Sequence, residues 1–307
     1  MGTVVDPQPT RLPRPSDGIA GARSRTIGIA AAAAPFGRDL EACFAAVEVL
    51  VARARAQGVH LLVLPEACLG GYVATLRGPR TDGSGDLPPA LALDGPEIAR
   101  LCSLAGDLVV CAGFCEADGD RRFNSAVAVT GDGVLGLHRK VHQPLDENVL
   151  FEAGDRFGAF DTPVGRMGLM ICYDKAFPES ARALTLDGAQ VIACLSAWPA
   201  ARTAQTPDLR DDRWTHRFDL YDRARALESQ VVWVSANQSG TFGSLRFVAS
   251  AKIVGPGGDV LAETGVEPGL AVAHVDVEES LAAARRYMFH LRDRRPDAYV
   301  GEGGLRP

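Results

Sequence analysis

The sequence lacks the features that mark several classes of protein. It has no excess of positive charge, since 32 Lys and Arg against 38 Asp and Glu give a net charge of −6. It contains no basic stripe with interleaved aromatic residues, so nucleic acid is not expected as a partner. The apolar stretch at residues 27–35 is too short to cross a bilayer, so no membrane partner is expected either. We expect a soluble, cytoplasmic protein.

The cysteines do not follow a disulfide or metal-binding pattern. Seven is an odd number, most lie in apolar runs, and no CxxC pair occurs. This composition predicts reduced, buried thiols. Cys111 and Cys115 share a strand-like segment but lack a second pair, so we expect no zinc site. The cysteines are Cys43, Cys68, Cys102, Cys111, Cys115, Cys172 and Cys194.

The chain divides into three parts by composition. Residues 1–25 are rich in Pro, Gly and Arg without the apolar core of a signal peptide, which predicts a flexible tail. Residues 26–280 are expected to form one domain, because no Pro/Gly/Ser linker interrupts them. Residues 281–307 are expected to form a C-terminal arm at a subunit interface of a homodimer or larger homo-oligomer.

Strand-like and helix-like runs alternate along the chain, which favours an α/β fold. Helical spacing is found at residues 39–57, 95–105, 178–187 and 214–229. Strand-like runs occupy residues 26–34, 60–64, 108–114, 166–171, 191–195, 231–236 and 249–254. Glycine-rich turns at residues 131–133 and 255–259 predict hairpins. A purely parallel sheet would not contain them, so we predict mixed sheets with helices on their outer faces.

Three strand-like runs, the third of which follows the turn at residues 131–133, end in a side chain that can take part in catalysis. Cys172 follows the strand of MGLMICYDKAFPE, Glu66 ends HLLVLPE, and Lys140 ends VLGLHRK. A thiol needs a base, because at its usual pKa it is mostly protonated at neutral pH. A buried glutamate can be that base, and an ammonium group stabilises both a thiolate and an oxyanion. Taken singly, each residue also has an ordinary role, as a core cysteine, a solvated carboxylate or a surface lysine.

Together these segments resemble the carbon–nitrogen hydrolase (nitrilase) superfamily. The order and separation of LLVLPE–CLGGY, GLHRKVHQP and GLMICYDKAFPE match its Glu–Lys–Cys triad. Further agreement is found in ENVLFEAGD, RARALESQVVWVSANQSG and SAKIVGPGGDVLAE, and the resemblance covers about residues 26–280. It implies a four-layer α-β-β-α sandwich, nitrilase-like, with mixed sheets, and subunits paired into dimers or larger assemblies.

The resemblance also implies a role for each matching residue. Cys172 would be the nucleophile, Glu66 the general base and Lys140 the cation that stabilises the oxyanion. The backbone N–H of Tyr173 is a second donor to that oxyanion. Glu147 falls where the family keeps an auxiliary glutamate, which orients the substrate and the lysine. No metal or organic cofactor is needed for this chemistry.

Four residues near the triad are expected to bind substrate: Tyr72, Tyr173, Lys175 and Trp198. Trp198 is expected to line the acyl pocket. Lys175 could hold a substrate carboxylate as a point charge, although not bidentately. The polar residues 200–213 form either a lid over the pocket or an ordinary surface loop.

The residues after the cysteine favour an amide as substrate. True nitrilases usually show Cys-Trp-Glu, whereas this chain has Cys-Tyr-Asp followed by Phe-Pro-Glu, as in amidases that act on small amides. We therefore expect a cysteine-dependent amidase that forms a thioester acyl-enzyme and releases ammonia or an amine. An N-carbamoyl amide hydrolase, releasing CO2 and ammonia, is the alternative, and a nitrilase is less favoured. Family members that act on carbamoyl amino acids tend to carry arginines where Lys175 and Ala176 stand.

Two hypotheses of another kind compete with this one. His138 or His142 could serve as the base of a Cys–His hydrolase, and their spacing would also suit a metal on a helix. We disfavour both, because the segment resembles a strand end and no third ligand is evident. A catalytically silent scaffold on the same fold is the non-enzyme alternative, against which the intact Glu–Lys–Cys set argues.

Overall fold

A computed structural model describes residues 26–76 and 87–299 of the chain. The predicted tail at residues 1–25 and the end of the predicted C-terminal arm lie outside the described residues. The α-helices are α1 (Leu40–Ala56), α2 (Pro96–Ala105), α3 (Pro178–Leu186), α4 (Arg213–Ser229) and α5 (Val277–Arg285). The strands are β1 (Thr26–Ala34), β2 (Val59–Val63), β3 (Ala90–Ala92), β4 (Val109–Asp118), β5 (Arg121–Thr130), β6 (Gly133–Arg139), β7 (Ala159–Thr162), β8 (Gly165–Ile171), β9 (Val191–Ser196), β10 (Val232–Gln238), β11 (Thr241–Phe242), β12 (Leu245–Arg246), β13 (Lys252–Val254), β14 (Val260–Glu263) and β15 (Gly269–Asp276).

Most of the strands form one continuous hydrogen-bonded sheet. Its main order is β6-β5-β4-β2-β1-β10-β9-β8-β7, while β15 pairs with β1 and β13 pairs with β10. The two halves of this order meet where β1 pairs with β10, over Ala33–Asn237 and Ala34–Gln238. Because that junction is short, the halves can fold against each other as two layers. Mixed pairing is confirmed, since β4, β5 and β6 are antiparallel while β1, β2, β9 and β10 are parallel.

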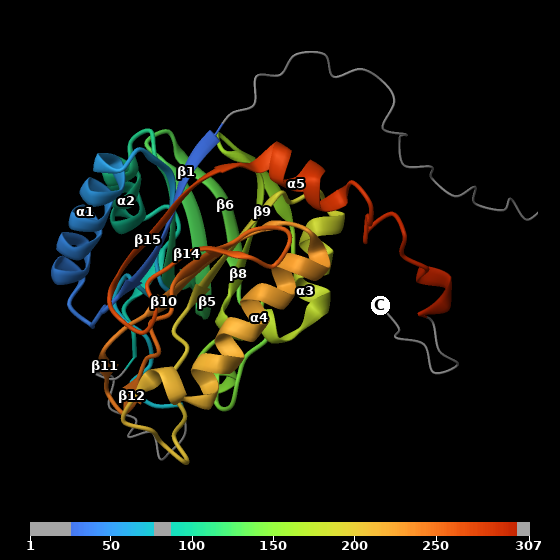
Figure 1. The fold of residues 1–307 in the computed structure, drawn as a ribbon. Coiled ribbons are helices and arrows are strands. Elements are labelled where there is room, and N and C mark those ends of the chain that lie inside the picture. Colours follow the sequence, from blue (N-terminus) through green and yellow to red (C-terminus); the bar gives the residue numbers. More distant parts are fainter. Residues whose placement is uncertain (1–25, 77–86, 300–307) are drawn as a thin grey trace, which may run out of the picture.

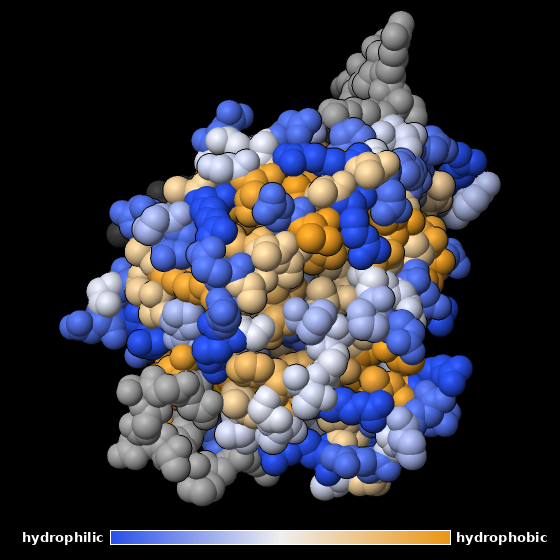
Figure 2. Space-filling model, turned by 90° about the vertical axis from the view of Figure 1, so that its left-hand side faces the viewer, coloured by the Kyte–Doolittle hydropathy of each residue, from blue (hydrophilic) through white to orange (hydrophobic). Residues whose placement is uncertain are grey.

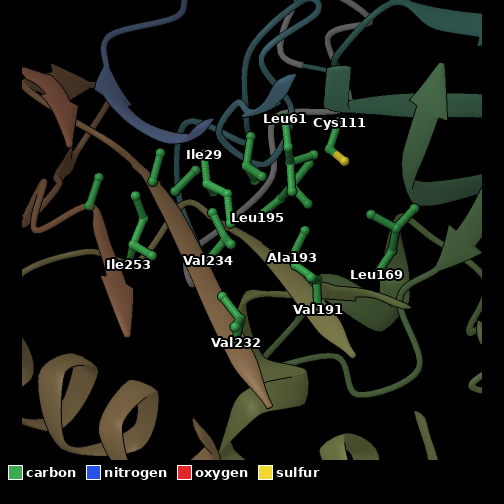
Figure 3. Packing of buried hydrophobic residues seen from close by; sticks show 14 of the residues in the cluster. Ile29, Leu61, Cys111, Leu169, Val191, Ala193, Leu195, Val232, Val234 and Ile253 are labelled. Carbon is green, nitrogen blue, oxygen red and sulfur yellow. The ribbon is translucent and has the colours of Figure 1, made fainter. Parts of the chain in front are cut away.

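Alternate residues of the central strands pack into different cores, as the period of a strand requires. In β1, Ile29 faces the core between the two sheet layers and Ala30 faces the core under α1 and α2. The inner core also takes Leu61 from β2, and Leu169 and Val191 from the opposite layer (Figure 3). Helices α1 and α2 cover one outer face, and α3 and α4 cover the other (Figure 1). The four-layer α-β-β-α prediction is therefore confirmed.

Capping residues define where the helices begin. Asp39 accepts hydrogen bonds from the backbone N–H groups of Glu41 and Ala42 at the start of α1, and Asp212 does the same for α4. Such caps satisfy N–H groups that have no partner within the helix. The apolar residues of α4 do not all face the core, because Phe218 is buried whereas Leu227 is 48% exposed.

The predicted pattern omits two elements near the C-terminus. Strand β15 pairs antiparallel with β1 from Thr26–Asp276 to Ala33–Gly269, and α5 follows it. The alternation of apolar residues in β15 is weak, and several of its side chains are only partly buried. Strand β15 therefore forms because it pairs with β1, which is buried except at Thr26, and not because of its own local pattern.

The outer surface is mixed in character. On the face that carries α1, hydrophilic side chains surround several hydrophobic areas (Figure 2). In residues 26–76 and 87–299, no helix combines the length and the apolar character needed to cross a membrane.

Strand direction brings the predicted site residues to one edge. Following the pairing from strand to strand, β2, β6 and β8 all run the same way. Their carboxyl ends therefore lie at the same side of the sheet, where ligand sites of α/β folds are commonly found.

Candidate active site

The structure brings the three strand-end residues together. Glu66 lies three residues beyond β2, Lys140 directly follows β6, and Cys172 directly follows β8. Glu66 and Lys140 are fully buried, and Cys172 is 5% exposed. Gly113 on β4 permits the close approach of the Glu66 segment, because a Cβ at that position would lie 2.7 Å from the Glu66 Cα.

Lys140 is the centre of a buried ionic cluster with two glutamates. Its Nζ donates to Glu66 Oε1 at 2.8 Å and to Glu147 Oε2 at 2.7 Å. Glu147 stands in the short 3-10 helix Glu147–Val149, where it is 1% exposed. Burial alone would lower the pKa of Lys140, but the charges of Glu147 and Glu66 outweigh it and raise that pKa well above its usual value. The ammonium therefore keeps its charge at neutral pH.

Sequence reasoning missed two groups that hold the glutamates in place. The side-chain amide of Asn124 on β5 donates to Glu66 Oε1 at 2.7 Å and to Glu147 Oε1 at 2.6 Å. The backbone N–H of Ala197, just beyond β9, donates to Glu66 Oε2 at 2.6 Å. The signal for Asn124 was a polar residue inside a buried strand, since such groups need hydrogen-bond partners.

The backbone at Cys172 is strained. Its φ is +48°, in the left-handed region that non-glycine residues rarely adopt. Ala67, next to Glu66, has a φ of +52°. Such conformations cost about 1–3 kcal/mol each and concentrate at functional sites, where the surrounding structure holds them in place. The segments that carry Cys172 and Glu66 therefore each contain a residue held in an unusual backbone conformation.

Asp174 fixes the Cys172 turn to the segment that follows Lys140. One of its oxygens accepts from the backbone N–H of Ile171 at 3.1 Å and lies 2.9 Å from His138 Nε2. The other accepts from the backbone N–H of His142 at 2.9 Å and lies 2.9 Å from His142 Nδ1. Burial by itself raises the pKa of Asp174, but the hydrogen bonds with the two histidines outweigh it and lower that pKa.

These contacts weaken the Cys–His hypothesis. The His138 and His142 rings each have a nitrogen within hydrogen-bond distance of an Asp174 oxygen, and each ring also stacks on Phe157. Their role in the structure is to anchor the turn. The described residues contain no group of three or more His, Cys, Asp or Glu arranged to hold a metal ion.

The Cys172 side chain is a protonated thiol at neutral pH. Burial is the main cause that raises the pKa of Cys172 well above its usual value, and the negative charge of Glu66 adds to it. Lys140, the backbone N–H of Ala197 and Lys175 oppose this shift without cancelling it. Burial also raises the pKa of Glu147, against the opposing charge of Lys140. A base is therefore required to remove the thiol proton.

A cavity of about 540 Å³ opens onto Cys172. Tyr72, Tyr173 and Trp198, all predicted to bind substrate, line it. Tyr72 is 3% exposed, and its ring centroid lies 5.7 Å from Lys140 Nζ. A volume of this size suits a small organic molecule.

The prediction that Lys175 faces the substrate is wrong. Its Nζ is fully buried, donates to Asp222 Oδ1 at 2.6 Å and lies 3.2 Å from the Phe218 ring centroid. It does not appear among the described residues that line the Cys172 cavity. A lysine in an apolar core needs a carboxylate partner, and Asp222 on α4 supplies it.

Comparison with known proteins agrees with this geometry. The family model of carbon-nitrogen hydrolases matches residues 28–285. A nitrilase of Pyrococcus abyssi is 34% identical over 240 residues, covering 76% of this chain and 83% of that protein. An N-carbamoylputrescine amidase of Arabidopsis thaliana is 30% identical over 278 residues, covering 85% and 90%.

A solved structure extends the likeness to the fold. It shows an amidase variant from Nesterenkonia sp. AN1 with the acetamide moiety of fluoroacetamide added covalently at the active-site cysteine. The TM-score is 0.71 at 25% identity, over 90% of this chain and 97% of that one. The relatives are hydrolases of non-peptide C–N bonds. The chain belongs to the carbon–nitrogen hydrolase family.

Proposed function

We propose that this enzyme hydrolyses a small amide through a thioester on Cys172. The observation that carries the proposal is the buried ammonium of Lys140, held between Glu66 and Glu147 beside a cavity that exposes the thiol. A charge held in a dry, preorganised site stabilises a developing oxyanion far better than the same charge in water.

Acylation begins with proton transfer from the thiol to the Glu66 carboxylate. The sulfur attacks the amide carbon, and the oxyanion that forms is stabilised by Lys140 and the backbone N–H of Tyr173. Protonated Glu66 then gives its proton to the departing nitrogen, the C–N bond breaks, and ammonia or an amine leaves. The acyl group remains on Cys172 as a thioester.

Deacylation reuses the same groups. Glu66, again a carboxylate, takes a proton from water while the water oxygen attacks the thioester carbon. The C–S bond breaks, the proton on Glu66 returns to sulfur, and a carboxylic acid is released. Glu147 keeps Lys140 in position during both steps, because it accepts two hydrogen bonds from Nζ.

N-carbamoyl compounds and nitriles are the competing substrates. The Arabidopsis relative is named for the first and the Pyrococcus relative for the second. The Cys-Tyr-Asp sequence at the nucleophile favours amides over nitriles. A catalytically silent scaffold would not need the raised pKa of Lys140, the strained Cys172 turn and the open cavity together.

An ammonia-release screen tests the proposal. Primary amides, N-carbamoyl compounds and nitriles are assayed side by side, with Cys172→Ala as the blank. We expect amides to be turned over fastest and the variant to be inactive. Equal ammonia release by wild type and Cys172→Ala on every substrate would refute the proposal.

We also propose that the enzyme works in the cytoplasm as a homo-oligomer. The seven cysteines are all free, as in a reducing compartment. Tyr287 and Met288, just beyond α5, are 87% and 66% exposed, which supports self-association at this arm. The double substitution Tyr287→Ser and Met288→Ser should shift the sedimentation profile toward smaller species. An unchanged profile would count against the arm as an interface.

A further inference from the structure

The outer part of the Cys172 cavity carries charge of one sign. Arg202 and Arg213 are the charged residues among its described lining, and no carboxylate joins them there. We call this pair the arginine rim. Both side chains are exposed. In a protein whose net charge is −6, two arginines without a carboxylate among the described lining residues are a local feature that composition does not explain.

Neither guanidinium of the arginine rim forms an ion pair within the described part of the chain. Arg213 Nη2 donates to a neutral hydroxyl, Thr203 Oγ1, at 2.6 Å. Arg210, in the preceding turn, instead pairs with Asp208 at 2.7 Å. An arginine presents five donors in a planar fork that matches a carboxylate, so the rim retains most of its binding capacity.

The carboxylate adjacent to Arg213 in the sequence is already occupied. Asp212, which precedes Arg213, is 1% exposed and accepts from the backbone N–H groups of Ala201 and Trp214. It therefore holds the rim segment and the start of α4 together. Its hydrogen bonds go to the backbone, which leaves Arg213 available to a ligand.

A third donor belongs to a residue that lines the cavity and has no acceptor among the described residues. Trp214 lines the cavity, and its indole Nε1 is buried without a hydrogen-bond partner among the described residues. The indole of Trp198, which also lines the cavity, is satisfied by the Trp214 carbonyl at 3.1 Å. A buried donor without a partner costs free energy, which a ligand oxygen would recover.

We propose that the arginine rim binds a carboxylate at the end of the substrate remote from the scissile bond. The preferred substrates are then small amides that carry an acid group, and amides that carry an ammonium are disfavoured. This inference rests on the proposed amidase function and narrows it. It also replaces Lys175, which is buried against Asp222, as the source of positive charge for the substrate.

Three amides of equal chain length separate the effect of charge from that of size. They are the monoamide of glutaric acid, pentanamide, and pentanamide with a terminal amine. We expect wild-type kcat/KM to be highest for the acid and lowest for the amine. Arg202→Gln and Arg213→Gln should each lower the ratio of the acid to the neutral amide by about tenfold, and the double variant by more. The loss should be mainly in KM, because the rim binds ground state and transition state alike.

Arg53→Gln is the matched control. Arg53 is an exposed residue of α1 outside the cavity lining, and its removal changes the net charge by the same amount. We expect it to leave the substrate ratio unchanged. If wild type turns over the neutral amide as well as the acid and the rim variants keep that ratio, the inference fails while the amidase proposal stands. If wild type releases ammonia from none of the three, and from no other amide of the screen, the amidase proposal itself fails.

Discussion

Two buried lysines in this molecule have opposite surroundings. Lys140 is shared by Glu66 and Glu147, so its cluster holds two carboxylates for one ammonium and adjoins the thiol and the cavity. Lys175 shares Asp222 with Lys252, at 2.6 and 3.5 Å. Both lysines of this second cluster lie against the ring of Phe218, at 3.2 and 4.7 Å.

The difference shows which feature marks a reactive site. Both Lys140 and Lys175 are fully buried and ion-paired, so burial of a charge does not distinguish them. What distinguishes Lys140 is a surplus carboxylate that can accept a proton and a cavity through which a substrate can arrive. The Lys175 cluster is balanced, because Lys252 also pairs with Asp219 at 2.8 Å, which gives two carboxylates for two ammonium groups. Lys175 lies against the rings of Phe218 and Trp198, and its bond to Asp222 joins η2 (Cys172–Ala176) to α4.

The largest expected effect follows from Lys140→Met. Removing the ammonium leaves the oxyanion without its main charge partner, so we expect kcat to fall by on the order of 10³. Under the Cys–His hypothesis the same variant would lose only part of its activity. Steady-state ammonia release, at a temperature where circular dichroism shows the variant folded, separates the two outcomes.

Lys175→Met should act mainly on stability. Taking one partner from a buried ion pair leaves Asp222 with only the longer contact to Lys252, at 3.5 Å, as its charge partner, which costs up to about 3–5 kcal/mol of unfolding free energy. Denaturant unfolding measures that loss. Turnover per folded molecule should stay within about tenfold of wild type, because catalysis depends on the other cluster. A loss of turnover as large as that of Lys140→Met would show that the two lysines do not differ in their importance for catalysis.

A smaller effect is expected at Asp174, which ties the Cys172 turn to the strand exit beyond Lys140. Its folded-state pKa is lowered from 3.8, so its stabilising contribution is complete above that pH and is lost as the pH falls through the folded value. Asp174→Asn should therefore lower stability near pH 7 by about 2 kcal/mol and flatten the loss of stability below pH 3.8. Unfolding curves recorded at several pH values test this. If the variant lost stability below pH 3.8 as steeply as wild type, the prediction would be contradicted.

Much of the fold and of the candidate site could be predicted from the sequence alone, because the ends of strands can be recognised from the apolar runs. Glu66, Lys140 and Cys172 each follow an apolar run, and Glu147 was placed by resemblance to a family segment. Side-chain direction was not visible. Lys175 is three residues from the nucleophile, yet it points into the α4 layer, whose Asp222 is distant in sequence. The hydrogen bonds of Asn124 and Asp174 could not be predicted, because their partners come from other elements.

If Cys172 carries the acyl group while Glu66 and Lys140 assist it, the acyl-enzyme can be trapped and weighed. The decisive experiment is intact-mass measurement on enzyme mixed with a small primary amide and quenched in acid within a turnover. We expect an adduct equal to the amide less ammonia, located on the peptide that contains Cys172 and absent from Cys172→Ala. Sustained ammonia release by Cys172→Ala, or an adduct on another residue, would contradict it.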